Sequence, residues 1–130
     1  MKSYRDLKIY QLSQELAIKI HAMPLTLPKF EMYEEGSRIR KSSKAVTSAI
    51  VEGYGRRIYK KDFIKFLVIS ISECDETIVH LDFLFKPGSL SSESLYNEFH
   101  ASYDDLSKEL TNLSSGLKIN GSQKSLNTPR

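Results

Sequence analysis

Apolar side chains recur at steps of three and four residues along most of the chain, which is the period of a helix with one buried face. The pattern divides into four helical segments, at about residues 6–23, 32–53, 60–86 and 91–117. No stretch alternates apolar and polar residues with the two-residue period of a strand. Because most connections are short, the pattern predicts an all-α fold, an antiparallel up-down four-helix bundle over residues 1–117 with a flexible C-terminal tail at 118–130.

The third segment has the most regular pattern of the four. A heptad seam continues over three repeats, at Ile64, Leu67, Ile71, Cys74, Ile78, Leu81 and Phe85. Several further apolar residues lie outside that seam, at Phe63, Phe66, Val68, Phe83 and Leu84. We therefore expect this helix to be buried on more than one side, either by the bundle or by another subunit.

Capping and breaking residues suggest where the segments begin and end. Asp6 is a suitable N-cap for the first helix, and Ser91 or Ser92 is suitable for the fourth. The first segment stops at Pro24, and the run over residues 24–36 contains a second proline. This run predicts an extended connection to the second helix, because proline restricts both itself and the residue before it.

The run "EGYGRR", which begins at Glu52, joins the second segment to the third. A P-loop would need a preceding strand and a Gly-Lys-Ser or Gly-Lys-Thr ending, and a dinucleotide-binding loop would need a third glycine. Since these features are missing, we interpret the run as a corner between helices, where Gly53 and Gly55 supply backbone freedom. A carboxylate is unfavourable at a helix C-terminus, so we expect Glu52 to pair with Arg56, Arg57 or a neighbouring chain.

The composition is that of a folded protein, with 40% hydrophobic and 27% charged residues among 130. The single cysteine, Cys74, excludes an internal disulfide and fits a reducing compartment. The N-terminal residues lack the apolar stretch of a signal peptide, and no apolar run is long enough to span a bilayer. We therefore expect a cytoplasmic protein without a membrane partner.

Charge is distributed unevenly, although the net charge is only +3. Residues 38–65 contain nine basic and two acidic residues, whereas residues 73–109 contain nine acidic and two basic ones. Such polarity can steer an anionic partner or pair one subunit with another. Tyr54 and Tyr59 lie among the basic residues and could stack on bases. The candidate nucleic-acid-binding residues are Arg38, Arg40, Lys41, Lys44, Arg56, Arg57, Lys60 and Lys61.

Residues that could support catalysis or bind a metal do not form a recognisable set. His21, His80 and His100 lie in three different segments, and the Glu-x-x-His motif of metal-binding bundles is absent. Asp75 and Glu76 precede His80 closely, which is more typical of a surface contact than of a metal site. Cys74 lies in the heptad seam, and the chain has no Gly-x-Ser-x-Gly motif. We predict no catalytic residues, no metal and no cofactor.

Three stretches carry a resemblance to a known family. They begin "YRDLKIYQL", "LPKFEMYEEG" and "KKDFIKFLV", and the resemblance covers roughly residues 4–115. The most specific part is "IVEGYGR", with Ile50, Glu52, Gly53 and Gly55 at the corner, although Ala49 stands where the family often has Asn. The chain resembles the four-helix-bundle proteins encoded in intervening sequences of bacterial large-subunit ribosomal RNA genes, which are often labelled ribosomal-protein-like.

The resemblance implies an antiparallel four-helix bundle that assembles as a homopentamer. It also implies a relationship to the accessory variability determinant of diversity-generating retroelements, which binds nucleic acid and a reverse transcriptase through a basic surface. By analogy, RNA, DNA and a reverse transcriptase are possible partners here, although a shared fold does not by itself carry function.

Three hypotheses about function remain open at this stage. The first is a non-enzymatic, oligomeric bundle that binds structured RNA or DNA through the basic residues of the second segment and the corner. The second is a protein–protein adaptor or assembly scaffold in which the basic face meets an acidic face, without a role in nucleic-acid binding. The third, an enzyme, is disfavoured because the sequence shows neither a nucleophile with its base nor a set of metal ligands.

Overall fold

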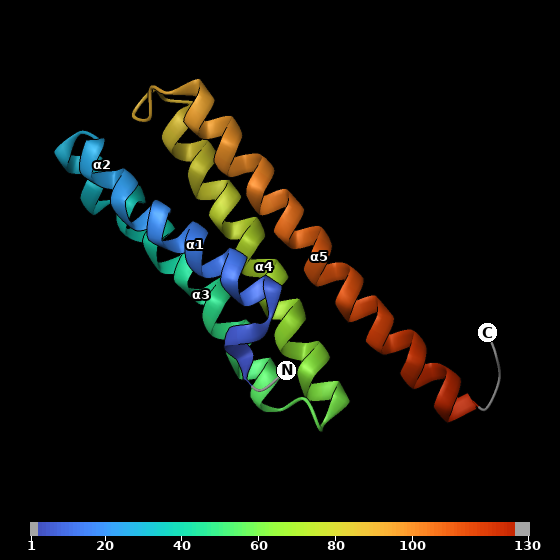
Figure 1. Ribbon diagram of the computed structural model, residues 1–130. Coiled ribbons are helices and arrows are strands. Elements are labelled where there is room, and N and C mark those ends of the chain that lie inside the picture. Colours follow the sequence, from blue (N-terminus) through green and yellow to red (C-terminus); the bar gives the residue numbers. More distant parts are fainter. Residues whose placement is uncertain (1–2, 127–130) are drawn as a thin grey trace.

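The computed structural model describes residues 3–126, and the side chains of residues 3–119 (Figure 1). It contains two short 3₁₀ turns, η1 (Tyr4–Asp6) and η2 (Met23–Thr26), and five α-helices. The helices are α1 (Lys8–Ala22), α2 (Lys29–Tyr33), α3 (Glu35–Gly55), α4 (Lys60–Phe85) and α5 (Glu93–Leu126). No strand occurs among these residues. The prediction of an all-α four-helix bundle is therefore confirmed, with α2 as an additional short helix.

The four long helices lie side by side, with α4 between α3 and α5 (Figure 1). Helix α1 packs mainly on α3 and makes fewer contacts with α5. Figure 1 shows α1 and α4 running from one end of the bundle to the other, and α3 and α5 running back. The N-terminal turn η1 packs on α3, at the end where α3 leads into α4.

Helix α4 is buried over a wider face than the heptad seam predicts. Leu67, Cys74 and Leu81 of the predicted seam are almost completely buried. The flank one residue earlier is buried as well, at Phe63, Ser70, Thr77 and Leu84, whereas Ile64, Ile71, Ile78 and Phe85 are only half-buried. The reason is that α4 contacts both α3 and α5, so two neighbouring stripes are covered. Outside them Val68, Ile69, Val79 and Phe83 remain exposed in the single chain.

Hydroxyl groups lie inside the bundle, and most of them make hydrogen bonds. The hydroxyls of Ser42 on α3 and Thr77 on α4 form a hydrogen bond of 2.8 Å, and Ser70 Oγ donates to the Val46 carbonyl at 2.9 Å. These small polar residues let α3 and α4 pack closely while their polar atoms stay satisfied. Among the described side chains, the Tyr103 hydroxyl is the buried polar group that makes no hydrogen bond of good geometry.

Of the two predicted helix N-caps, one differs from the structure and one is confirmed. Asp6 does not cap α1, because Ser3 caps the turn η1 and the backbone N–H of Ser3 donates to the Asp6 carboxylate at 3.2 Å. Helix α1 follows Leu7, which has an extended backbone and no capping side chain. The prediction for the fourth helix is confirmed, since Ser92 Oγ accepts a hydrogen bond from the Leu95 N–H at 3.1 Å.

The connection over residues 24–36 is helical rather than extended, so that prediction was wrong. Pro24 lies in the first turn of η2, where its missing N–H costs nothing. Pro28 immediately precedes α2, and its carbonyl accepts the first hydrogen bonds of that helix. Gly36 already belongs to α3, and a Cβ there would lie 2.9 Å from the Pro24 Cβ. The contact of Pro24 in η2 with Gly36 in α3, rather than local backbone preference, therefore keeps the connection compact.

The glycines of the "EGYGRR" run also differ from their prediction. Gly53 and Gly55 lie in the last turn of α3, and neither has a positive φ. Among the described residues, the left-handed conformation occurs at Gly88, with φ of 93°, in the connection between α4 and α5. A need for the left-handed backbone conformation therefore does not explain why glycine occurs at Gly53 and Gly55.

The C-terminal helix α5 continues to Leu126, past the point at which the apolar period of the sequence ends. The flexible tail over residues 118–130 stays a prediction, and its last four residues lie outside the part of the chain that the structure describes. Within the described part, no helix combines the length and the hydropathy that crossing a bilayer requires.

Candidate nucleic-acid interface

The turn between α3 and α4 depends on a close approach of the two helices at Gly53. A Cβ at this position would lie 3.0 Å from the Phe66 Cβ and 3.2 Å from Phe63 Cδ1, so only glycine fits without a shift. The chain then turns through backbone hydrogen bonds, including one of 2.8 Å from the Tyr59 N–H to the Arg56 carbonyl. At Gly55 a Cβ would meet nothing within 4 Å. Gly53 is thus a packing residue of the turn.

An ion-pair network fixes the first arginine of the turn. Arg56 Nε lies 3.4 Å from the Glu52 carboxylate, which confirms the expected pairing, and Arg56 Nη1 lies 3.9 Å from the Asp62 carboxylate. The Arg56 guanidinium also lies 5.2 Å from the centre of the Phe66 ring. With two carboxylates beside it, Arg56 contributes little free positive charge to the surface.

Other basic side chains at the turn are available to a ligand. Arg57 donates to the Tyr54 carbonyl at 3.0 Å and lies over the Tyr54 ring at 4.1 Å, but it has no carboxylate partner among the described side chains. Lys60 and Lys61 likewise make no ion pair with any residue that the structure describes. Ile58 and Tyr59, between these cations, are 80% and 64% exposed. We call residues 57–61 the corner.

The N-terminal turn adds a cation that sequence reasoning missed. Arg5 belongs to η1, is exposed, and has its guanidinium 5.0 Å from the centre of the Tyr4 ring. Since η1 packs on α3 near the corner, Arg5 lies at the same end of the bundle (Figure 1). About 50 residues separate Arg5 from the corner in sequence, so no local pattern could have associated them.

The remaining predicted residues form a separate group. Arg38, Arg40, Lys41 and Lys44 lie about 17–26 Å from the end of α3, at 1.5 Å per residue. Arg38 Nη1 lies 3.4 Å from the Glu35 carboxylate, and Arg40 Nε donates to the His21 carbonyl of α1 at 2.9 Å. Lys41 and Lys44 are exposed. The eight predicted residues therefore divide into a corner group and a group on the body of α3.

A groove between α3 and α4 contains a histidine–carboxylate pair that sequence reasoning also missed. His80 Nδ1 lies 2.7 Å from Glu35 Oε2, and both side chains are 15% exposed. Glu76 lies on the other side of the ring, 4.0 Å from His80 Nε2. Burial, followed by the neighbouring Glu76 carboxylate, raises the pKa of Glu73 in the same groove. These carboxylates offset the charges of Arg38 and Lys41, so the groove of about 460 Å³ does not favour an anion.

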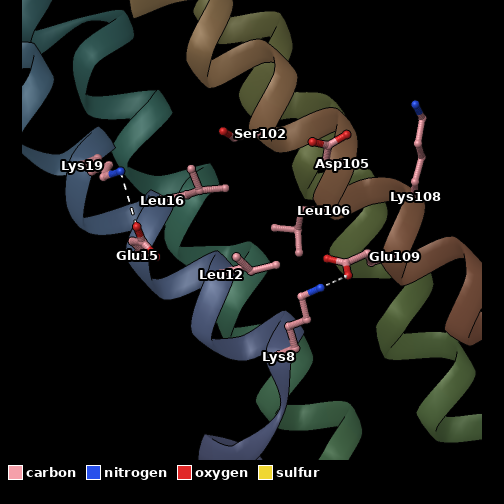
Figure 2. A pocket seen from close by; sticks show the side chains of 10 residues that line it. All are labelled: Lys8, Leu12, Glu15, Leu16, Lys19, Ser102, Asp105, Leu106, Lys108 and Glu109. Atoms are coloured by element: carbon pink, nitrogen blue, oxygen red, sulfur yellow. Dashed lines mark ion pairs between the residues drawn. The ribbon is translucent and has the colours of Figure 1, made fainter.

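A second groove of about 550 Å³ separates α1 from α5 (Figure 2). Figure 2 shows Leu12 and Leu16 from α1 facing Leu106 from α5, and Lys8 reaching across to Glu109, with Nζ 3.1 Å from the carboxylate. The lining contains three lysines and three carboxylates, whose charges balance. This groove therefore offers an apolar floor without a cluster suited to phosphate.

Residues often used in catalysis are placed in structural roles. Cys74 is completely buried, and burial, with smaller contributions from Asp75 and Glu73, raises the pKa of its thiol to about 12. His100 lies 3.1 Å from Asp104, one turn later on the same exposed surface. No three His, Cys, Asp or Glu side chains in the described part of the chain are grouped so that they could hold a metal ion.

Comparison with known proteins identifies the family of the chain. No curated protein matches the chain. The model of the family described as 23S rRNA-intervening sequence protein matches residues 5–112, which includes all of α1, α3 and α4 and the corner between them. The resemblance based on the three stretches and the "IVEGYGR" run is therefore confirmed, and the chain belongs to the 23S rRNA-intervening sequence protein family.

Proposed function

We propose that this protein is a non-enzymatic, oligomeric bundle that binds RNA or DNA through the corner. The observation that carries the proposal is the group formed by Arg57, Lys60 and Lys61, which have no carboxylate partners within the described residues. Phosphate groups supply most of the affinity in such interfaces, and unpaired cations can approach them without breaking an existing ion pair. Arg5 extends the positive surface on the same end of the bundle.

Assembly into an oligomer would strengthen a contact that is small in one chain. The exposed apolar residues Val79 and Phe83 support self-association, because they lie one turn apart on α4, outside the bundle core. In a ring, as the homopentamer of the family resemblance implies, each subunit would present one corner. Several weak contacts would then act on the same nucleic acid with a higher effective concentration.

The test is binding of a labelled nucleic acid by an R57E/K61E variant, compared with a K29E/K86E control. Both variants change the net charge equally, but Lys29 and Lys86 are exposed residues of α2 and of the α4–α5 connection, at the opposite end of the bundle. We expect the corner variant to lose about tenfold or more in affinity, and the slope of log K against log salt to fall by about 2 units. Equal losses in both variants would contradict the corner as the binding site.

A protein–protein adaptor is the second candidate, favoured by the acidic surface of α4 and α5. Asp75, Glu76 and Asp105 are exposed there and could pair with the corner of another copy or partner. Such an assembly would dissociate at high salt and would elute without nucleic acid. Light scattering with absorbance at two wavelengths during size-exclusion chromatography, at low and high salt, distinguishes the two functions.

A further inference from the structure

We infer that the corner recognises unpaired bases, so that its ligand is single-stranded nucleic acid or a single-stranded loop rather than a regular duplex. The inference rests on the proposed function and specifies the class of ligand. It depends on Tyr59 as a stacking platform, on Ile58 beside it, and on cations on both sides of this pair. The two side chains are 64% and 80% exposed.

Tyr59 combines a fixed backbone with a free ring. Its N–H donates to the Arg56 carbonyl at 2.8 Å, and its own carbonyl accepts the N–H of Phe63 at 3.0 Å as the N-cap of α4. The backbone is therefore held on both sides, which reduces the entropy that binding must remove. Within the described residues, the Tyr59 ring makes no aromatic or cation–π contact. Its faces are thus available to a base.

Tyr54, the other tyrosine near the corner, has a different role. Its ring is already covered by the Arg57 guanidinium at 4.1 Å, and its carbonyl accepts a hydrogen bond from the same side chain. These two contacts hold the Arg57 guanidinium against Tyr54. Arg57 before Tyr59 and Lys61 after it can then contact the phosphates that flank a stacked base.

The geometry of the corner explains why a duplex is the poorer ligand. Ile58 and Tyr59 lie in the turn between α3 and α4, at one end of the bundle (Figure 1), and both side chains are exposed. In a regular duplex the base faces are covered by their neighbours, and only base edges and phosphates are accessible. Unpaired bases expose their faces, which aromatic side chains bind with little dependence on sequence.

The chain offers a matched control for Tyr59. Tyr33, the last residue of α2, is 69% exposed and also lacks a ring contact among the described residues. It lies at the other end of the bundle, with Glu34 and Glu35 next to it in the sequence. Removal of this ring reproduces the loss of exposed aromatic surface without affecting a basic surface.

The experiment measures the binding of full-length protein to three fluorescent probes of one sequence: single-stranded RNA, single-stranded DNA and the DNA duplex. We expect tighter binding of the single strands, and we expect Tyr59→Ala to weaken that binding by about 5- to 150-fold, the range for loss of one stacked base. The same variant should change duplex binding less than about twofold, because the phosphate contacts remain. Tyr59→Phe should retain single-strand binding, and Tyr33→Ala should behave as the wild type.

The outcomes separate this inference from the proposed function. If the wild type binds duplex as tightly as single strands, or if Tyr59→Ala loses nothing while R57E/K61E loses affinity for every probe, the inference is overturned and the proposed function stands. If the wild type binds none of the probes at low salt, the proposed function is overturned, and the inference with it. A preference between the RNA and DNA single strands identifies which of the two is the ligand. Circular dichroism verifies that each variant is folded.

Discussion

Replacement of Gly53 by alanine tests whether the turn between α3 and α4 depends on close packing. Both glycines near the end of α3 are helical, so alanine should stabilise either position through helix propensity alone, by about 0.5–1 kcal/mol. At Gly55 nothing lies within 4 Å of the added methyl group, and this gain should be observed. Gly55→Ala is therefore the matched control in the same helix.

At Gly53 the added methyl group has no room. It would lie 3.0 Å from the Cβ of Phe66, 3.2 Å from Phe63 Cδ1 and 3.4 Å from the Phe63 carbonyl oxygen. The Cβ of Phe66 is attached directly to the α4 backbone, so side-chain rotation cannot relieve the contact and α4 itself must move. Overpacking of this kind costs about 1–3 kcal/mol, which exceeds the gain in helix propensity. Gly53→Ala should therefore be less stable than Gly55→Ala by about 1–3 kcal/mol.

Urea unfolding followed by circular dichroism measures this difference. The two variants and the wild type are compared at equal protein concentration, because assembly would make the apparent stability depend on concentration. For a domain of this size the difference corresponds to about 4 °C in melting temperature per kcal/mol. Equal stabilisation by both substitutions would refute the reasoning, since it would show that α3 and α4 are not in contact at Gly53.

Three further predictions concern the interior and the α3–α4 groove. The Cys74 thiol, whose pKa burial raises to about 12, should not react with a thiol reagent in the native protein but should react after unfolding, and rapid native labelling would contradict its placement. Tyr103→Phe should raise the free energy of unfolding by about 1 kcal/mol, because it removes a buried hydroxyl without a well-formed hydrogen bond. If urea unfolding instead shows a lower free energy of unfolding, the hydroxyl is bonded to the nearby Ser43. Burial and the neighbouring Glu76 raise the pKa of Glu73 in the folded chain, so stability is lost as the pH rises through the pKa of the folded state. Glu73→Gln should therefore raise the free energy of unfolding at neutral pH by about 0.2–1 kcal/mol, the scale of exposed charges, and should not raise it at acidic pH. The urea midpoint measured at the two pH values checks this difference.

The helices were predictable because each long helix has one apolar stripe that the bundle must cover. The pattern found Leu67, Cys74 and Leu81 as the centre of the buried face of α4. It did not find the helical turns between α1 and α3, because proline is compatible both with an extended chain and with the first turn of a helix. The choice between these depends on the contact between Pro24 and Gly36, which sequence periodicity cannot reveal.

The candidate site was predictable where its residues are close in sequence. Arg57 and Lys61 are only four residues apart, so any short turn between the two helices would place them close together. The same reasoning could not show that Arg40 is bound to a carbonyl of α1, or that Arg5 lies at the corner end. Nor could it find the contact between Glu35 and His80, which are 45 residues apart. Each of these depends on which helices are neighbours, and that is decided by tertiary packing.

The end of α3 and the corner that follows it divide into residues that form the turn and residues that are free to bind. Ile50 and Gly53, from the family signature, are buried, and Glu52 is occupied by its ion pair with Arg56. None of these groups is available to a ligand without loss of a contact that holds the turn. Arg57, Tyr59 and Lys61, which follow the signature, are exposed and make no ion pair with any described residue. It follows that substitutions of Ile50, Glu52 or Gly53 should affect stability and binding together, whereas those at Tyr59 and Lys61 should change binding alone.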